Sequence, residues 1–256
     1  LSIELQESVV AMQAAEVTAT QDGEVMNEMA TVSARAFTVE ETDRYAGSRG
    51  DPARMASNFA GVQGADDSRN DIVVRGNSPT GVLWRVEGVD LPNPNHFSVP
   101  GTGGGPVAIV NNKTLANSDF FTAAFPAEFG NSTAAVFDLR LRNGNQDQWH
   151  GSAQLGFLGT EVLAEGPLNR EKRSSFLINY RYSTAVIFSA LGIDIGTSAV
   201  PKYQDGSFKF HVPTSGGGAF SLWGLGGNSS VDILISDQVR PERNIYGDND
   251  CDQFFR

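Results

Sequence analysis

The sequence contains a single cysteine, Cys251, among 256 residues, which excludes an intrachain disulfide and a site built from several thiolates. Histidine is also scarce. His96, His150 and His211 are the only three, and none lies in a pattern typical of nucleophilic catalysis. No stretch approaches the roughly 20 apolar residues that a membrane-spanning helix needs. We therefore expect no enzyme activity, no cofactor and no metal site.

Positive charge is the second deficit. There are 19 Lys and Arg residues against 30 Asp and Glu, which gives a net charge of −11 at pH 7. Binding to nucleic-acid phosphates requires clustered Lys and Arg, so nucleic acid is excluded as a partner. Glycine is abundant, with 28 residues, and it accompanies many short apolar runs. This combination favours strands and turns over a helical bundle.

The two ends of the sequence indicate a fragment of a longer protein. The chain begins with Leu1 rather than Met and ends at Arg256 in an acidic run. Apolar residues alternate over residues 1–10, which suits the last strand of a preceding β-domain. Residues 11–34 are predicted to be a tether, with a short extended segment at 14–20.

The next segment carries helix punctuation. Thr38 and Glu41 fit a capping box, in which each side chain bonds a backbone N–H of the other residue. Asp51 and Pro52 predict the start of a second helix, because proline at the first helical position loses no hydrogen bond. Gly61 is expected to end that helix.

A hairpin is predicted to follow. Residues 72–74 form a continuous apolar run typical of a buried strand, 76–81 read as a turn, and 82–89 as the returning strand. In such a hairpin the outer loops, 63–70 and 92–106, emerge at one end of the sheet. Loops presented together on a rigid scaffold are common binding surfaces.

Beyond the hairpin, residues 115–131 are expected to be a short helix or an irregular connection. Residues 136–142 alternate apolar and charged side chains, which predicts a strand with one solvated face. From Trp149 onward, strands of about 8 to 11 residues are separated alternately by short and long connectors. Phe208 and Phe210 alternate with polar neighbours, the dyad pattern of outer-membrane strands.

Two loops match known ligand-binding motifs only in part. Residues 101–106 (GTGGGP) lack the Lys-Ser/Thr of a phosphate-binding loop, so a flexible loop is the expected structure. Asp248, Asp250 and Asp252 begin a calcium-loop spacing, but no glycine follows at the sixth position. An acidic surface loop is the favoured interpretation there.

Three stretches resemble a family of known proteins, the TonB-dependent outer-membrane receptors. They are IVVRG (72–76), WRVEGVDL (84–91), and Phe129-Gly130 followed by the strand at 136–141. Two residues depart from the family pattern, since Glu87 replaces its usual Asp and Phe129 its usual Tyr. The residue sequences of several other stretches are similar to those in the Bacteroidetes branch of the family, in which a carboxypeptidase-regulatory-like domain precedes the receptor.

The resemblance implies a fold and a domain order. The fold is an α+β plug domain followed by antiparallel β-strands of an incomplete transmembrane β-barrel. Residues 1–10 are the last strand of the preceding domain and 11–34 the tether with a TonB-box-like segment. Residues 35–147 form the plug, and 148–256 the first strands of the barrel. The protein would lie in the bacterial outer membrane, with its tether in the periplasm.

The resemblance also implies functional residues, in three groups. The TonB contact comprises Glu16, Val17, Thr18 and Ala19; the plug motif comprises Arg75, Gly76, Glu87, Gly88, Phe129 and Gly130; the ligand-facing loops contain Asp66, Asp67, Ser68, Asn93, Asn95 and His96. Arg75 is expected to be buried against the barrel wall and paired with Glu87. Bulk at Gly76 or Gly88 is expected to clash with neighbouring chain.

The implied function is active import of a nutrient across the outer membrane, with the plug gating the barrel. Its partners would be the TonB energy-transducing protein and an imported small molecule, oligosaccharide or peptide, with a surface lipoprotein as a further candidate. Two other classes stay open. The first is a secreted or surface β-rich module that binds glycan without transport. The second, an outer-membrane enzyme, is disfavoured because no active-site constellation is present.

Overall fold

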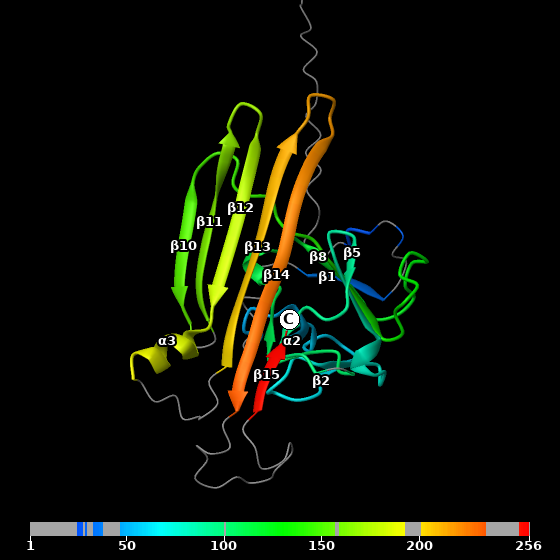
Figure 1. Ribbon diagram of the computed structural model, residues 1–256. Coiled ribbons are helices and arrows are strands. Elements are labelled where there is room, and N and C mark those ends of the chain that lie inside the picture. The colour runs from blue at the N-terminus through cyan, green and yellow to red at the C-terminus, as the bar shows by residue number, and fades with distance from the viewer. Residues whose placement is uncertain are drawn as a thin grey trace, which may run out of the picture.

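The computed structural model describes residues 25–27, 29, 33–37, 47–99, 101–156, 159–192, 201–233 and 251–255. Its two largest sheets lie side by side: a short mixed sheet and a longer antiparallel sheet (Figure 1). The expected strand at 1–10, the extended segment at 14–20 and the capping box at Thr38 and Glu41 lie outside the described residues.

The mixed sheet has five strands in the order β1-β8-β9-β4-β5. Its central strand, β9, runs parallel to β4 and antiparallel to β8. The bounds are β1 Ala34–Phe37, β4 Val82–Val86, β5 Val89–Leu91, β8 Ser118–Phe121 and β9 Ala135–Leu139. The strand predicted from the alternation near residue 136 is therefore confirmed, and it occupies the middle of the sheet.

Burial corrects two expectations about this sheet. Every residue of β9 is buried, so the strand has no solvated face. The apolar side carries the main core and the other side is covered by Phe121 and Phe129. β8 lies within the segment expected to be helical or irregular. All four residues of β8 are buried, and a strand buried on both faces shows no alternation that would mark it in the sequence.

Stacked aromatic rings fill the main core. Trp84 and Phe137 lie with ring centroids 4.2 Å apart at an interplanar angle of 9°, and Phe120 lies 4.4 Å from Phe137. Helix α2 (Pro52–Ala56) covers this cluster with Met55, which is fully buried. The predicted helix start is confirmed, because Asp51 caps it and Pro52 is its first residue. The helix ends at Ala56, earlier than Gly61.

The predicted hairpin is wrong, because its first strand pairs with a different strand. β3 (Ile72–Val74) pairs with β2 (Val62–Gly64), the strand before it, instead of with β4. The chain already reverses at Arg75-Gly76, where Asn77 N–H donates to Val74 O at 2.9 Å. A continuous apolar run indicates burial on both faces but does not identify which neighbour pairs with it.

The second glycine motif forms the tight turn that joins β4 to β5. Glu87 and Gly88 both have positive φ, 49° and 82°, which is the conformation of a two-residue type I′ hairpin. Arg75 and Gly76 share this conformation, with φ of 50° and 81°. A Cβ at either glycine would meet nothing within 4 Å. The expected clash is therefore wrong, and the backbone angle is the reason for glycine.

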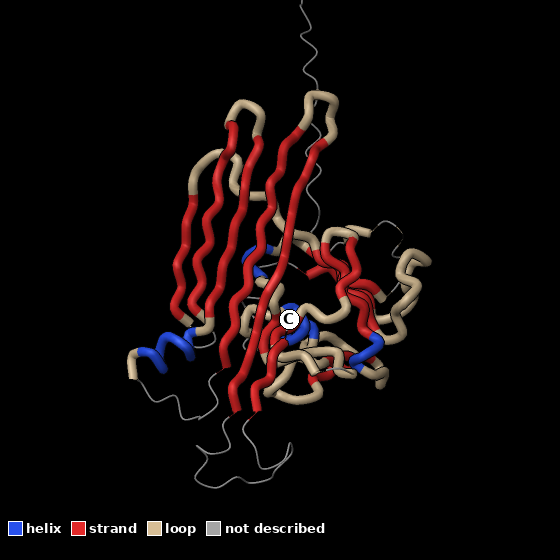
Figure 2. Tube along the Cα trace, viewed as in Figure 1, coloured by secondary structure: helices blue, strands red, loops and turns tan. Residues whose placement is uncertain are grey.

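The antiparallel sheet has six strands, each paired with the next in sequence. The bounds are β10 His150–Leu155, β11 Thr160–Asn169, β12 Ser174–Tyr182, β13 Pro201–Pro213, β14 Ala219–Ile233 and β15 Cys251–Phe255. The strands predicted from residue 149 onward are confirmed. β15 is an addition, since its segment was expected to belong to an acidic loop. Strands β11 to β14 are the longest elements among the described residues, as can be followed in Figure 2.

Short elements complete the fold. β6 (Asn95–His96) pairs with β7 (Val107–Ala108), and the 3-10 turns η1 (Pro79–Gly81) and η2 (Asn112–Thr114) lead into β4 and toward β8. Helix α3 (Thr184–Ala190) follows β12. Among the described residues, no helix has the length and hydropathy to cross a membrane.

The turn geometry predicts a difference between two glycines of the family motifs. Gly88→Ala should lower the free energy of unfolding by about 1–2 kcal/mol, because an L-residue is strained in the left-handed region. Gly130→Ala is the matched control, because a Cβ there also meets nothing within 4 Å and its φ is not positive. Urea unfolding followed by tryptophan fluorescence measures both. Equal midpoints for the two variants would contradict the type I′ assignment.

Candidate functional site

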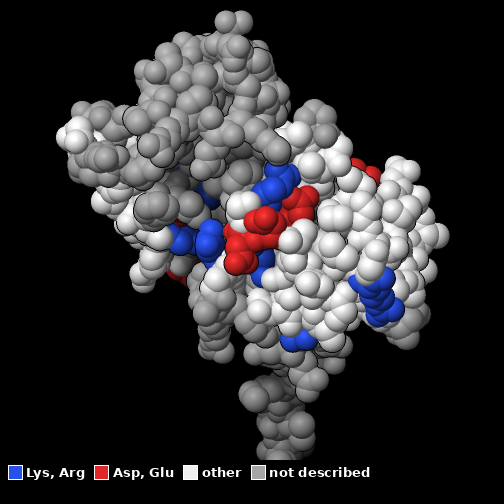
Figure 3. Space-filling model, turned by 90° about the horizontal axis from the view of Figure 1, so that it is seen from below, with Lys and Arg blue, Asp and Glu red and all other residues white. Residues whose placement is uncertain are grey.

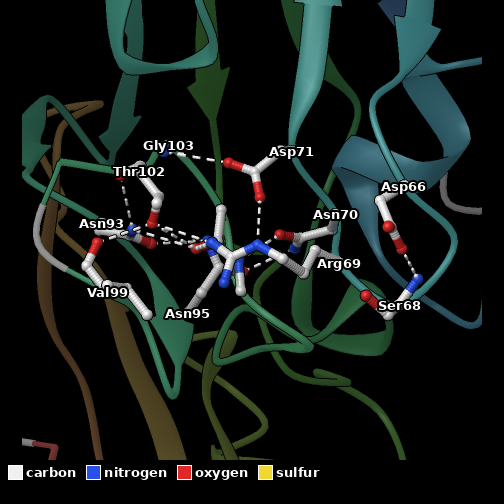
Figure 4. A network of polar contacts seen from close by, with 12 residues as sticks. Asp66, Ser68, Arg69, Asn70, Asp71, Asn93, Asn95, Val99, Thr102 and Gly103 are labelled. Atoms are coloured by element: carbon white, nitrogen blue, oxygen red, sulfur yellow. Dashed lines mark hydrogen bonds and ion pairs between the residues drawn. The ribbon is translucent and has the colours of Figure 1, made fainter. Parts of the chain in front are cut away.

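The two loops expected to lie together, 63–70 and 92–106, are in direct contact. Asn70 N–H donates to Gly105 O at 2.9 Å. The Arg69 guanidinium donates to Thr102 Oγ1 and Gly104 O, each at 2.8 Å (Figure 4). The predicted adjacency is confirmed, although hairpin geometry is not its cause. The loops hold each other through their own polar groups.

Asn70 is the centre of this loop cluster. Its side-chain amide donates to Asp51 Oδ2 at 2.7 Å and to Asn95 Oδ1 at 2.6 Å, and its carbonyl accepts from Gly105 N–H at 2.7 Å. The side chain is buried, so each of these bonds replaces one to water. One amide thereby joins the cap of α2 to both loops.

The glycine run at 101–106 is packed tightly against this centre. A Cβ at Gly103 would lie 2.1 Å from Pro79 O, one at Gly104 would lie 2.6 Å from Asn70 Oδ1, and one at Gly105 would lie 2.5 Å from His96 O. These distances are far below any real carbon contact, so three consecutive positions accept only glycine. The flexible loop expected here is instead a segment whose backbone closely approaches its neighbours.

Charges surround the cluster. Arg69 Nε donates to Asp71 Oδ2 at 2.7 Å, and Asp71 Oδ1 accepts from Gly103 N–H at 3.0 Å. Burial raises the pKa of Asp51, and the hydrogen bond from Asn70 acts in the opposite direction. The hydrogen bonds from Ser68 lower the pKa of the exposed Asp66. The network therefore combines a rigid buried part with a charged, solvated rim.

A shallow hollow of about 190 Å³ opens beside the rim. Arg54, Asp66, Asp67, Arg69 and Asp71 are among the side chains that line it. The face seen in Figure 3 carries acidic side chains gathered next to basic ones. A hollow with both signs of charge suits a polar ligand with hydrogen-bonding groups more than an apolar one.

The predicted ligand-facing residues separate into two groups. Asp66, Asp67 and Ser68 are exposed at the rim, and Asn93 is half-buried. Asn95 and His96 are buried, with relative exposures of 5% and 1%. Asn95 bonds Asn70 within the loop cluster and His96 bonds Asp205 on the antiparallel sheet. Both side chains therefore face the interior, and the expectation that they face a ligand directly is corrected. The sequence around them carries no signal of that orientation.

His96 belongs to a contact between the two sheets. Its Nε2 lies 2.8 Å from Asp205 Oδ2 on β13, and the same carboxylate accepts from the Arg181 guanidinium at 2.7 Å. Arg181 also donates to Ala108 O. The His96 ring packs on Tyr203 with centroids 4.8 Å apart. A buried carboxylate on the antiparallel sheet is thus shared between one cation and one imidazole.

Three further contacts join the sheets in the same way. Arg142 donates to both oxygens of Glu165 at 2.5 and 3.0 Å. Asn111 donates to Glu161 Oε2 at 2.6 Å, in a carboxylate that Lys113 approaches to 3.2 Å. On β13 the Lys209 ammonium donates to Glu87 Oε1 at 2.9 Å and to a backbone carbonyl. We call this set, with the Asp205 contact, the polar seam.

The plug-motif residues do not pair as expected. Arg75 is exposed, and its guanidinium donates to Ser33 Oγ at 3.3 Å and Thr122 Oγ1 at 3.2 Å. Glu87 reaches the other sheet, where it accepts from Lys209. The predicted Arg75–Glu87 pair is wrong, because each residue lies at the tip of a separate type I′ turn and the two tips point to different surroundings.

The remaining motif residues have structural contacts. Phe129 is buried against Phe121, with ring centroids 5.3 Å apart, and the Arg85 guanidinium lies 4.5 Å above its ring. Gly130 follows it at the surface. The predicted TonB-contact residues 16–19 lie outside the described residues. The polar seam was not predicted from the sequence. Charged residues alternate with apolar ones along β11 and β13, and this alternation indicates one polar face on each strand.

Comparisons with known proteins give only distant structural similarities. No protein-family model and no curated protein matches the sequence. Similar solved structures include the ferric enterobactin receptor PfeA in complex with BCV-L6, at 15% identity and a TM-score of 0.48, over 84% of this chain and 36% of that one. A mutant of this receptor from Pseudomonas aeruginosa is 14% identical, with a TM-score of 0.49, over 78% and 33%.

A third similar structure is the copper transporter OprC, at 11% identity and a TM-score of 0.49. It covers 82% of this chain and 32% of that one. The present chain therefore spans about a third of the length of each of these proteins.

The central position of Asn70 predicts a large effect of its removal. Asn70→Ala should lower the free energy of unfolding by roughly 2–4 kcal/mol, because the buried oxygens of Asp51 and Asn95 lose their donor. Asn58→Ala is the control, since Asn58 is exposed and bonds only within its own turn. Denaturant midpoints of the purified proteins measure both. An Asn70 variant as stable as the Asn58 variant would contradict the central role of the amide.

Proposed function

We propose that this chain is part of a TonB-dependent receptor that imports a nutrient across the bacterial outer membrane. In this proposal the antiparallel sheet is a segment of the transmembrane barrel wall. The domain that contains the mixed sheet is the plug that closes the barrel. The family motifs in the sequence support the proposal, and the polarity of the antiparallel sheet carries it.

The antiparallel sheet has an apolar face that is exposed and a polar face that is buried. Side chains of the exposed face include Val162, Ile178, Tyr180, Tyr182, Phe208, Phe220 and Leu222. Those buried on the opposite face include Glu161, Asn179, Asp205, Ser207 and Lys209. Strand alternation places the two sets on opposite faces.

This arrangement is the reverse of what water favours. A water-soluble sheet turns its apolar face to the core and its charges to solvent, and large exposed apolar patches mark interaction surfaces. A strand that faces lipid on one side and a polar lumen on the other shows the polarity observed here. We infer that the exposed face contacts the hydrocarbon of the membrane and that the polar seam lies inside the barrel.

The position of the loop cluster indicates the side of the membrane from which the ligand would approach. Phe97, in the second loop, donates its N–H to Ser229 near the end of β14, and His96 packs on Tyr203 near the start of β13. These strand ends are the ones joined by long connectors, whereas residues 169–173 and 214–218 are short turns at the other end (Figure 1). Outer-membrane barrels carry long loops outside and short turns in the periplasm. The loop cluster would therefore face the outside and meet the ligand.

The mechanism that follows involves no covalent chemistry. A polar ligand binds at the rim of the loop cluster, and the TonB protein binds the tether and pulls. The pull separates part of the plug from the polar seam and opens a path through the barrel. Three further parts of this proposal rest on the sequence resemblance. They are a preceding β-domain whose last strand is residues 1–10, a Bacteroidetes origin and a partner surface lipoprotein.

The inverted polarity predicts how the exposed face responds to charge. Ile178→Arg in the full-length receptor should make membrane insertion less favourable by about 2–4 kcal/mol, since an arginine near the bilayer midplane is costly. Glu171→Arg, in the short turn after β11, should have little effect. The measured quantity is the amount of folded receptor in outer-membrane fractions. Equal amounts for both variants would favour the alternative, a water-soluble surface module that binds glycan.

The tether predicts a separation of binding from uptake. Residues 14–20 alternate Val17 and Ala19 with threonines, so the segment can add as a strand to the sheet edge of TonB. Val17→Pro removes one ladder N–H and should abolish uptake while ligand binding at the cell surface persists. Val17→Ala keeps the N–H and should retain most uptake. Uptake that survives the proline would mean that the energising contact lies elsewhere.

A further inference from the structure

A short segment that follows the tether's first half is docked on the mixed sheet. Residues 25–27 lie against β8, more than 90 positions later in the chain. Met26 N–H donates to Asp119 Oδ1 at 2.9 Å, and Asn27 N–H donates to Asp119 Oδ2 at 2.8 Å. Both oxygens of one carboxylate thus accept from two successive backbone amides. The side chain of Asp119 is buried, with a relative exposure of 1%.

Hydrogen bonds account for most of the docking, because the methionine side chains at and after the segment are exposed. Met26 is 42% exposed and Met29 is 70% exposed. A third bond comes from the Asn27 side-chain amide, which donates to Glu128 Oε1 at 3.0 Å. Glu128 is itself held by the Arg85 guanidinium at 3.2 Å. Val25 is half-buried, so the segment can leave while exposing little apolar surface beyond this one side chain.

The carboxylate that receives the segment lies next to another one. Asp119 on β8 is directly opposite Asp138 on β9 in the antiparallel register, and like charges opposite each other are unfavourable. Among the described residues, neither nearby cation forms a salt bridge with Asp119. Arg85 bonds Asp90 and Glu128, while Arg140 is half-exposed and lies 3.9 Å from Asp138. Burial raises the pKa of Asp138, the charge of Arg140 acts in the opposite direction, and the charge of Asp119 raises the pKa again.

Docking therefore changes the electrostatics of the pair. With the segment in place, two oriented N–H dipoles stabilise the charge of Asp119, since a charge-assisted hydrogen bond is roughly twice as strong as a neutral one. With the segment gone, a buried carboxylate opposite a second carboxylate loses those donors. The undocked state is disfavoured, which drives the segment back.

The order of elements along the chain gives this contact a role. β1, the four-residue edge strand that follows the segment, also pairs with β8, and Ala36 is the register partner of Asp119. A pull from the N-terminal side reaches residues 26 and 27 before it reaches β1. The docked segment thus shields the edge of the mixed sheet from that pull.

We propose that Asp119 is a latch that docks residues 26 and 27 on the mixed sheet and must open before β1 can separate from β8. That a force pulls on the latch rests on the proposed function, in which TonB pulls the tether. The docking itself does not depend on it. The latch holds through two main-chain hydrogen bonds, and it recloses when the pull ends because Asp119 has no equal substitute for the two amides.

Hydrogen exchange in the full-length receptor, without TonB and without ligand, tests the latch. Asp119→Ala should speed amide exchange in the peptide that contains Met26 and Asn27 by at least about tenfold, because each lost bond to a charged acceptor exceeds the energy of one tenfold step. Amides of β9 serve as the internal reference and should keep their protection. Unchanged exchange at residues 26 and 27, with β9 intact, would overturn the proposal.

A second pair of variants keeps the test valid if the Asp119 variant fails to fold. Asn27→Pro removes one of the two backbone donors without altering the mixed sheet, and Asn27→Ala keeps the donor but loses the side-chain bond to Glu128. The proline variant should speed exchange at Met26 at least about tenfold, and the alanine variant should change it much less. Equal exchange at Met26 in the two variants would contradict a latch made by main-chain amides.

The outcome is separable from that of the proposed function. Exchange is measured without transport, so a latch that loosens as expected in a receptor whose uptake survives Val17→Pro would refute the TonB contact and leave the latch standing. A receptor that loses uptake with Val17→Pro but shows unchanged exchange in the Asp119 and Asn27 variants would refute the latch alone.

Discussion

The structure depends on one constraint, which is that the charges on the buried face of the antiparallel sheet each need a partner. Glu161, Glu165, Asp205 and Lys209 all point toward the mixed-sheet domain, and that domain supplies their partners. A buried charge that loses its partner is costly, whereas a satisfied pair adds little net stability. The polar seam therefore fixes where the two sheets meet more than it holds them together.

This balance suits a plug that must move in the proposed receptor. An apolar seam of the same size would resist separation in proportion to the area exposed to water. In the polar seam, groups such as Arg142 and Glu165 exchange one polar partner for water when they part, so the net cost of opening is small. The apolar attraction between the sheets is concentrated where Trp223 and Leu225 pack on the main core.

The sequence predicts the strands more reliably than their partners. Alternation located β11 to β14, and capping located α2, because both signals are local. Three outcomes required non-local information. β3 pairs with β2 instead of β4. β8 is buried on both faces and shows no alternation. The side chain of His96 contacts Asp205, 109 positions away. The glycine run at 103–105 was expected to be flexible, since the backbone of Pro79 and the side chain of Asn70 that crowd it cannot be inferred from its composition.

Stability is distributed unevenly between the two ends of the mixed-sheet domain. At the loop cluster, Asn70 and Arg69 bind several groups each, and glycines allow backbone contacts that exclude water. At the tether end, a four-residue edge strand and the carboxylates of Asp119 and Glu128 hold the chain. Edges with few buried contacts open at lower free energy than a core. A force from the N-terminus would therefore open the Asp119 latch and then separate β1 while the loop cluster stays folded, so the surface proposed to bind the ligand would keep its shape while the plug begins to open.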